Sequence, residues 1–492
     1  MQRNTIKSIW PNEALSSKWF LALCAALCIT LASVCWAFTI DDAWIVARYA
    51  KNIVIGAGYA FNPHLRSDGV TGPLWIVPMI TAEVLGLDPI NFAKIASITS
   101  SALAVAMAAH FAAYSVADSH KTVAAILVVL GCACEINLWV WSSSGLETGL
   151  ATLTLSVVIF SALRSTPYAG LCLGLANLCL AWLRPECLLC GFVALLILLS
   201  SARKHRIAAL GLSGIGVLSV AGFRVFMFGQ ALPLSIQAKP FSLLNGLRYS
   251  TLALGVLGLG LGMMLIAILA KQRKILLLGL ILLATHCIAV LAVGGDWMPG
   301  FRLFVPILPA FCAFLSIAVI ELYQRRDGLA GCPCLGMVFL LPIVDSTVQL
   351  PRIAAAAHLQ SERASLLGRY LSQNVKSAAL VDIGLVGYQH DLFIVDLAGL
   401  TDPVIAMQPG AYLGKRLPIA HLDRKAPQAI VLRTRAWHKS WQTQQPPPSV
   451  FLSAIESNLA RHPWFRHHYR FAKHLRYRKG YHYLVYLQKP QR

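Results

Sequence analysis

The sequence has few charged residues for its length, and acidic residues are the scarcer kind. Only 13% of the 492 residues are charged, with 21 Asp and Glu against 42 Lys and Arg, whereas 57% are hydrophobic. A soluble globular domain carries about 25% charged residues, so this composition excludes an ordinary soluble protein. Because long apolar runs recur along most of the chain, we predict a membrane protein with many spans.

Cysteine is absent from the whole C-terminal part of the chain. All thirteen cysteines lie between Cys24 and Cys334, within or beside apolar runs. This placement argues against a disulfide framework and favours small hydrophobic side chains in helix packing. Cys187 and Cys190 have CxxC spacing, but they lie in the apolar stretch RPECLLCGFVALLILLS, so we expect neither metal binding nor redox chemistry there.

The N-terminus lacks the pattern of a cleavable signal peptide. The first residues, MQRNTIKSIWPNEALSSK, are too long and too polar for an n-region, and no small-residue cleavage site follows the apolar run Trp19–Ile40. We therefore expect this run to remain as the first membrane span.

Eleven apolar runs are candidate membrane spans, and the loops between them differ in charge. Short basic turns, such as ARKHR at 202–206 and KQRK at 271–274, alternate with less basic loops. The positive-inside rule places the basic turns in the cytoplasm, which predicts a cytoplasmic N-terminus and an outer C-terminus. The predicted spans cover roughly residues 19–40, 92–116, 122–141, 147–164, 168–182, 186–201, 206–228, 246–270, 274–293, 302–322 and 330–348.

The apolar stretch GPLWIVPMITAEVLGL at 72–87 is not counted as a span. It is short, contains Pro78 and Glu83, and would reverse the orientation of every later loop. We predict a re-entrant or interfacial helix within one long first outer loop, about residues 41–91. The other loops with unusual motifs then gather on the same outer face: SSSGLET, WLRPE, FGQALPLSIQAKP and VGGDWMPGFR.

The residues from 349 to 492 are predicted to form a small extracytoplasmic α/β domain beside the all-α membrane domain of residues 1–348. This segment has about twenty Lys and Arg and about seven Asp and Glu. Its excess of positive charge is more than half of the net charge of +21 of the whole chain. The segment 377–403 alternates apolar strands with a glycine-containing turn. Aromatic and basic residues alternate near the C-terminus, and an outer location favours membrane lipids or an anionic glycan over nucleic acid.

Two adjacent carboxylates, Asp41 and Asp42, directly follow the first apolar run. Ionisable groups at a membrane boundary are costly, which makes them functional candidates. A hydroxyl that attacks the anomeric carbon of a sugar needs one carboxylate as general base. A leaving phosphate needs cations instead, and the outer loops offer four candidates: Arg48, Arg184, Lys239 and Arg302.

Several candidates also have a structural interpretation. Asp41 fits the N-cap of a helix that starts two residues later, and Glu147 fits the first turn of a span. Asp296 lies among glycines and prolines, so it also fits a tight turn. Arg184 stands two residues before Glu186, and an ion pair between them explains it almost as well as phosphate binding.

The first outer loop resembles that of a known enzyme family. DDAWIVARYAKNIVIGAGYAFNP, followed by SDGVTGPLW, is similar to this loop in the GT-C membrane glycosyltransferases that resemble the mycobacterial terminal β-(1→2)-arabinofuranosyltransferase. The later stretches SGLET, LRPE, GGDWMPGFRLFVPILP and DLAGLTDP are similar to further signatures of that family, in the same order. The resemblance therefore covers nearly the whole chain.

The resemblance implies a GT-C fold and an inverting transfer from a polyprenyl-phosphate sugar, with Asp41 or Asp42 as the base. It adds Asp68 and Trp75, in SDGVTGPLW, to the candidate site. Asp68 stands where the family usually has Glu, and the loop that contains Lys239 matches the family pattern only loosely. Some GT-C enzymes use a divalent cation, but a DD pair without a third ligand leaves a metal unassigned.

Three functions compete at this point. The preferred one is a glycosyltransferase that moves a sugar, arabinofuranose by the resemblance, from polyprenyl phosphate to a cell-envelope glycan, lipopolysaccharide or pilin-like acceptor on the outer face of the inner membrane. The second is an oligosaccharide ligase or polymerase with a diphosphate-linked donor. A lipid-linked sugar transporter is disfavoured, because the charged candidates gather at one interface and no inverted repeat is visible.

Overall fold

A computed structural model of the chain describes most of its residues. These are residues 18–164, 166–200, 205–239, 241–271, 274–296, 298, 300–324, 352, 365–478 and 480–490. The chain divides into two compact units, and we describe each by itself. Unit 1 comprises Met1–Trp36, Lys94–Val217 and Phe241–Ile353, and unit 2 comprises Ala37–Ala93, Leu218–Pro240 and Ala354–Arg492.

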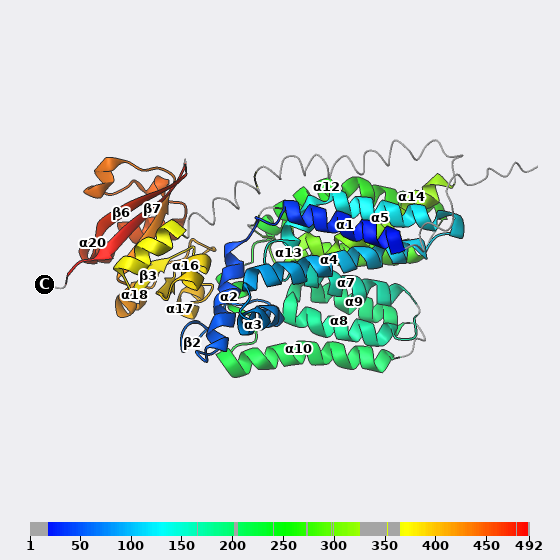
Figure 1. The fold of residues 1–492 in the computed structure, drawn as a ribbon, viewed down its shortest axis with the longest axis horizontal. Coiled ribbons are helices and arrows are strands. Elements are labelled where there is room, and N and C mark those ends of the chain that lie inside the picture. Colours follow the sequence, from blue (N-terminus) through cyan, green and yellow to red (C-terminus); the bar gives the residue numbers. More distant parts are fainter. Residues whose placement is uncertain are drawn as a thin grey trace, which may run out of the picture. The chain divides into compact units, whose positions relative to one another are not determined.

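Unit 1 consists of apolar helices that pack around α14 (Figure 1). Every residue of α14 from Leu308 to Glu321 is buried, and the helix contacts α5, α7, α12 and α13. The helices of this unit are α1 (Lys18–Val34), most of α4 (Pro89–Ala113), η2 (Asp118–His120), α5 (Lys121–Cys134), α6 (Ile136–Ser142), α7 (Thr148–Leu163), α8 (Ala169–Leu183), η3 (Pro185–Cys187), α9 (Leu188–Leu199), the first half of α10 (Arg206–Phe228), α12 (Leu243–Lys271), α13 (Lys274–Ala292), η4 (Arg302–Ile307) and α14 (Leu308–Tyr323).

Four described helices are long and apolar enough to cross a membrane: α4, α10, α13 and the continuous η4–α14. The predicted span 122–141 is not one straight helix, because α5 and α6 meet at Glu135 with a bend of 66°. Counted together, this broken pair gives a fifth span. Helices α7, α8 and α9 are apolar but shorter than 18 residues, and α1 ends at Val34 rather than at residue 40. The number of eleven spans stays a prediction, and its last member, 330–348, lies outside the described residues.

Unit 2 combines the first outer loop with a sheet formed by C-terminal residues. The predicted helix at 72–87 is present as η1 and α3. The elements are α2 (Asp41–Val54), β1 (Ala60–Asn62), β2 (Leu65–Arg66), η1 (Pro73–Trp75), α3 (Ile76–Val84), α11 (Leu234–Ala238), β3 (Ser377–Leu380), α16 (Gly384–Gln389), β4 (Phe393–Asp396), α17 (Pro403–Ala406), α18 (Ile419–Lys425), β5 (Ala429–Thr434), η5 (Lys439–Gln442), η6 (Pro448–Val450), α19 (Ala454–Arg461), α20 (Pro463–His468), β6 (Tyr469–Arg478) and β7 (Tyr481–Gln488).

The five-stranded sheet of unit 2 has the order β4-β3-β5-β7-β6. Strand β3 is parallel to β4 and β5, and β7 is antiparallel to β5 and β6. The segment 377–403 forms β3 and β4 at the expected strand positions, with the short α16 where a turn was expected. All six residues of β5 are buried, because β5 is central and its aliphatic side chains belong to the core of the sheet.

Helix α2 brings the first outer loop to the C-terminal residues. Its apolar side is buried, and the helix packs against α3, β1 and α16 (Figure 1). The loop and the C-terminal sheet therefore lie in one compact unit. The division of the chain into domains at residue 348 stays a prediction.

Candidate active site

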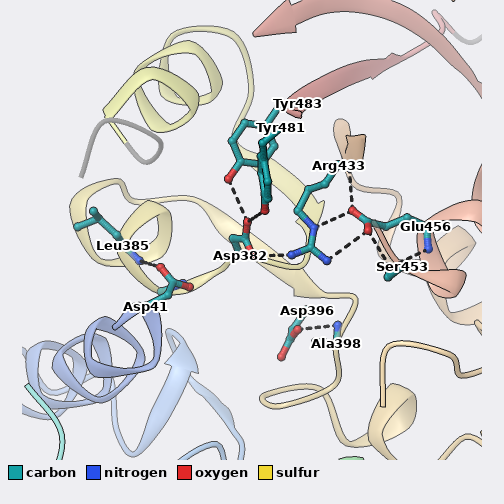
Figure 2. A network of polar contacts seen from close by, with 11 residues as sticks. Asp41, Asp382, Leu385, Asp396, Ala398, Arg433, Ser453, Glu456, Tyr481 and Tyr483 are labelled. Carbon is teal, nitrogen blue, oxygen red and sulfur yellow. Dashed lines mark hydrogen bonds and ion pairs between the residues drawn. The ribbon is translucent and has the colours of Figure 1, made fainter. Parts of the chain in front are cut away.

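The two adjacent acids stand at the start of α2. The helix begins at Asp41, and its N-cap residue, Ile40, makes no side-chain capping bond. The expected start two residues later, with Asp41 as N-cap, is therefore wrong. The Asp41 carboxylate instead accepts hydrogen bonds from the backbone N–H groups of Gly384 (2.8 Å) and Leu385 (3.1 Å), which begin α16. Figure 2 shows the bond from Leu385. Asp41 thus ties the first outer loop to the C-terminal residues, 343 positions away.

This contact requires glycine at position 384. A Cβ atom on Gly384 would overlap the backbone carbonyl oxygen of Asp41 and lie 2.9 Å from the Asp41 Cγ atom. A larger residue would have to push α16 away from α2. Packing without a side chain therefore brings the two backbone N–H groups within reach of the carboxylate.

A second carboxylate, Asp382, precedes α16 and is held by three donors (Figure 2). Its Oδ2 accepts hydrogen bonds from the hydroxyl groups of Tyr481 (2.9 Å) and Tyr483 (3.0 Å) on β7. Its Oδ1 accepts a hydrogen bond of 2.8 Å from Arg433 Nη1 on β5. The loop that leads into α16 is thereby fixed to two strands of the sheet.

Arg433 joins Asp382 to a third carboxylate. Its Nε and Nη2 atoms donate to the two carboxylate oxygens of Glu456 across 2.9 and 3.2 Å, and its backbone N–H adds a bond of 2.7 Å. Ser453 also donates to Glu456, across 2.7 Å. Burial lowers the pKa of Arg433, but the carboxylates of Asp382 and Glu456 outweigh this effect and hold the pKa well above its usual value.

The pKa of Asp41 is high for an aspartate. Burial is the largest cause, and the nearby negative charge of Asp382 is the second; together they raise the pKa of Asp41 to about 7, against the lowering effect of the N–H groups of Leu385 and Gly384. Asp41 therefore takes up and releases its proton near neutral pH.

The negative charge of Asp42 acts on Tyr412, a half-buried tyrosine that the sequence did not single out. Burial first, and then the negative charge of Asp42, raise the pKa of the Tyr412 hydroxyl well above its usual value. The ammonium group of Lys239 lies over the ring of Tyr412, 5.1 Å from its centre. Tyr412 thus connects the neighbourhood of a candidate base with a candidate phosphate-binding cation.

The stretch DLAGLTDP forms an ordered loop after β4. The buried Asp396 carboxylate accepts hydrogen bonds from the backbone N–H groups of Ala398 and Thr401, each of 2.8 Å, and from the Thr401 hydroxyl at 3.2 Å. Burial raises the pKa of Asp396 to about 6, although these hydrogen bonds lower it. Gly399 adopts a φ of 77° within the turn, a conformation that favours glycine.

Three other predicted residues of unit 2 are buried. The guanidinium of Arg48 donates a 2.7 Å hydrogen bond to the carbonyl oxygen of Leu392 and lies over the Phe61 ring, and burial lowers the pKa of Arg48 to about 10. Asp68 pairs with another arginine, as described below, and Trp75 is 1% exposed within the packing of η1. These contacts are structural, and phosphate binding by Arg48 stays a prediction without support from them.

Three of the predicted residues in unit 1 form one buried cluster. Arg184 lies with Nε 2.7 Å from Glu147 and with Nη1 2.9 Å from Glu186. The expected pairing of Arg184 with Glu186 is therefore confirmed. Two carboxylates already surround this guanidinium, so its contacts favour a structural role over binding a phosphate.

Asp296 and Arg302 form a second ion pair in unit 1. Arg302 Nη2 lies 2.7 Å from Asp296, and its guanidinium lies 5.5 Å from the centre of the Trp141 ring. The Asp296 carboxylate also accepts a 3.4 Å hydrogen bond from the backbone N–H of Met298. Asp296 thus organises its turn and neutralises the arginine, and phosphate binding by Arg302 stays a prediction.

A metal site is not found within the described ranges, because no three His, Cys, Asp or Glu side chains there are grouped to hold an ion. Cys187 and Cys190 are buried free cysteines in η3 and α9. A divalent metal therefore stays unassigned.

Five further residues of this region make key contacts that no motif in the sequence indicates. Their partners lie tens to hundreds of positions away in the chain, so local spacing carried no signal for them. An arginine inside the apolar run 206–228 was the one visible hint, because an isolated charge there is costly. The missed residues are Arg224, Asp382, Tyr412, Arg433 and Glu456.

Comparison with known proteins identifies relatives of the sequence. A family model described as a domain of unknown function (DUF8728) matches residues 351–486. The chain is 25% identical over 398 residues to the terminal β-(1→2)-arabinofuranosyltransferase of Corynebacterium glutamicum. This match covers 67% of the chain and spans about half, 54%, of that relative's length.

The fold is shared with crystal structures of ArnT from Cupriavidus metallidurans. The structure bound to undecaprenyl phosphate superimposes with a TM-score of 0.55 at 12% identity, covering 79% of this chain and 88% of ArnT. The apo structure gives a TM-score of 0.54 at 13% identity, with 78% and 87% covered. The resemblance to the GT-C membrane glycosyltransferases is confirmed. At these identities, the likeness to ArnT shows the GT-C fold alone.

Proposed function

We propose that this chain is an inverting glycosyltransferase that moves arabinofuranose from a polyprenyl-phosphate donor to an acceptor on the outer face of the inner membrane. The acceptor is a cell-envelope glycan, lipopolysaccharide or a pilin-like surface protein. The N-terminus is cytoplasmic, and the active site and C-terminus are extracytoplasmic. The likeness to an arabinofuranosyltransferase supports the sugar, and the shared fold with a protein crystallised with undecaprenyl phosphate supports the class of donor.

Asp42 is the proposed general base. The observation that carries this assignment is that Asp41 accepts hydrogen bonds from the N–H groups of Gly384 and Leu385, whereas the charge of Asp42 acts on Tyr412, whose ring lies under the ammonium group of Lys239. Asp42 accepts the proton of the acceptor hydroxyl while the hydroxyl oxygen bonds to the anomeric carbon. The bond from that carbon to the phosphate oxygen breaks, which inverts the anomeric centre and releases polyprenyl phosphate.

Lys239 is the proposed partner of the leaving phosphate. Its ammonium group lies over the ring of Tyr412, 5.1 Å from the centre, and the negative charge of Asp42 acts on the same tyrosine. A cation beside the departing oxygen stabilises the negative charge that develops there.

Asp41 is the proposed positioning residue for Asp42. Its hydrogen bonds to α16 fix the first turn of α2, and that turn carries the neighbouring Asp42. Loss of Asp41 should therefore reduce both the stability of unit 2 and the rate of transfer, whereas loss of Asp42 should reduce the rate alone.

The test compares the wild type with Asp41→Asn and Asp42→Asn in detergent. Transfer from synthetic polyprenyl-phosphoryl arabinofuranose is measured together with the melting temperature. Asp42→Asn should lose about 10²–10⁴-fold in rate with a normal melting temperature, because a general base contributes that much. Asp391→Asn is the control, because its side chain is 98% exposed and pairs with Lys51 at the surface.

Two outcomes would contradict the proposal. Wild-type rates in Asp42→Asn would remove Asp42 from the chemistry. A wild type that transfers neither arabinofuranose nor any other polyprenyl-phosphate sugar, but accepts a diphosphate-linked oligosaccharide, would replace the transferase with the ligase or polymerase.

A further inference from the structure

A cavity in unit 2 lies apart from the groups assigned to the transfer reaction. It has a volume of about 190 Å³ and lies between the β1–β2 hairpin, β4, the loop before α17, and α18. Pockets that enclose a drug-sized molecule measure roughly 300–1,000 Å³. This cavity therefore fits one unit of a larger ligand.

Most neutral polar groups around the cavity are already committed. The Asn62 side chain bonds to both the N–H and the carbonyl group of Ile394, at 2.9 and 2.8 Å. The Ser67 and Tyr49 hydroxyl groups are 2.6 Å apart, and the Thr401 hydroxyl donates to Asp396. These groups hold the walls together and need no ligand.

The acidic group at the cavity is also paired. Asp402 Oδ2 lies 2.8 Å from His421 Nε2, and Asp402 Oδ1 accepts hydrogen bonds from the backbone N–H groups of Val404 (3.0 Å) and Ile405 (3.3 Å). A carboxylate that caps a helix and pairs with a histidine presents little uncompensated negative charge to the cavity.

Two cations at the cavity have no such commitment. Arg66 ends β2 and is exposed, and the Lys425 ammonium lies over the Phe393 ring, 5.2 Å from its centre. Across the described parts of the chain, neither cationic group takes part in a hydrogen bond or an ion pair. Two positive charges and one aromatic ring thus line a space that holds a single small unit.

We propose that this cavity binds one negatively charged sugar of the acceptor glycan. Arg66 and Lys425 hold its carboxylate or phosphate group, and the space beside them takes the sugar ring. The chemistry of the ligand follows from the cavity, whereas its role as acceptor rests on the proposed function. The cavity would thus select an acidic glycan over a neutral one.

The test measures binding to the full-length protein in detergent by isothermal titration calorimetry. The probes are trigalacturonic acid, the same trisaccharide with its carboxylates methyl-esterified, and inorganic phosphate. We expect the acid to bind and the ester to bind at least 10-fold more weakly. Lys425→Gln and Arg66→Gln should each weaken binding of the acid by at least 10-fold.

Arg424→Gln is the matched control. Arg424 is the neighbour of Lys425 on α18, but it is exposed, bonds only weakly to the carbonyl of Ala420 at 3.4 Å, and does not line the cavity. It should bind the acid like the wild type. Because Arg66 is exposed, its replacement leaves folding intact, and the result does not depend on how Lys425→Gln folds.

Three results would overturn the inference: no binding of the acid, equal binding of acid and ester, or wild-type binding by both cavity variants. Phosphate that binds as tightly as the trisaccharide would also overturn the recognition of a sugar. Donor consumption by the wild type, measured separately, tests the proposed function. Binding with the expected selectivity in a protein that never consumes donor would keep the anionic site and remove the transferase.

Discussion

Arg224 donates a hydrogen bond of 3.0 Å to the carboxylate of Asp68, and both side chains are almost completely buried in unit 2. The same guanidinium bonds to the carbonyl oxygens of Thr71 (2.7 Å) and Val70 (3.4 Å). One arginine of α10 thus fixes the part of the first outer loop that carries SDGVTG. Burial raises the pKa of Asp68 to about 6, although Arg224 lowers it.

Breaking this pair should destabilise unit 2. Arg224→Ala leaves the Asp68 carboxylate buried without its partner, which costs about 3–5 kcal/mol. The free energy of unfolding in detergent, followed by tryptophan fluorescence, measures the loss. The control is Asp391→Ala, which breaks the pair of Lys51 with the 98% exposed Asp391 side chain and should cost less than about 1 kcal/mol. Equal losses in the two variants would show that the buried pair contributes no special stability.

Arg433 should be needed for the order of the loop before α16. Arg433→Met leaves both Asp382 and Glu456 without their cation, so we expect a loss of about 3–5 kcal/mol and a lower rate of transfer. Arg433→Lys should recover part of the stability, because an ammonium keeps the charge but not the two-point contact with Glu456. Thermal unfolding and transfer assays measure both effects. Arg435→Met, an exposed neighbour, is the control, and an equally stable Arg433→Met would refute this role.

Gly384→Ala should loosen the contact between α2 and α16. The added methyl group would collide with the carbonyl oxygen of Asp41, so the N–H groups that hold its carboxylate must retreat. We expect faster hydrogen exchange at residues 384 and 385 and a reduced transfer rate. Gly414→Ala is the matched control, because its nearest neighbour atom lies 3.4 Å from the new Cβ. Unchanged exchange in Gly384→Ala would show that glycine is not required there.

The stability of the protein should fall as pH rises towards neutrality. The pKa of Asp41 is about 7 in the folded protein and about 3.9 in an unfolded chain, so the folded state binds more protons between these values. Unfolding then releases a proton, and the stabilising contribution, complete below pH 4, is lost as pH rises through 7. One proton gives a slope of at most about 1.4 kcal/mol per pH unit.

Asp41→Asn provides the check on this pH dependence. Melting temperatures between pH 6 and 7.5 should decline less steeply in this variant than in the wild type, because Asp68 and Asp396, with pKa values of about 6, titrate lower. Asp391→Asn should keep the wild-type slope. If Asp41→Asn also kept it, the carboxylate of Asp41 would not titrate in this range.

Site residues could be predicted from the sequence where they stand out from their immediate neighbours. Residues whose partners are distant in the chain could not be predicted. Asp41 and Asp42 were visible because two charges end an apolar run, and the pairing of Arg184 with Glu186 was visible because the partners are two residues apart. The partners of Asp382 are 51, 99 and 101 positions away, and only the sheet brings them together. Distance along the chain therefore set the limit of the prediction.

The burial of individual side chains also could not be predicted from the spacing of residues in the sequence. Arginine is a common phosphate ligand, but the Arg48 side chain is buried, with its guanidinium over the Phe61 ring. The apolar run 122–141 was predicted as one span, but it bends at Glu135. Apolar composition gives no information on the direction of a helix, so hydropathy could not predict this bend. The strands β3 and β4 were foreseen, since short apolar segments bounded by glycine are a local signal.

Strand β7 is synthesised after every other strand of the sheet, yet it lies between β5 and β6. Its residues Tyr481 and Tyr483 hold Asp382, which stands two and three positions before Gly384 and Leu385, whose N–H groups bind Asp41. A nascent chain in which β7 is not yet made therefore carries both acids of α2 without the tyrosines that fix the loop before α16. Competence for the proposed reaction thus depends on the strand that is made after all the others of this sheet.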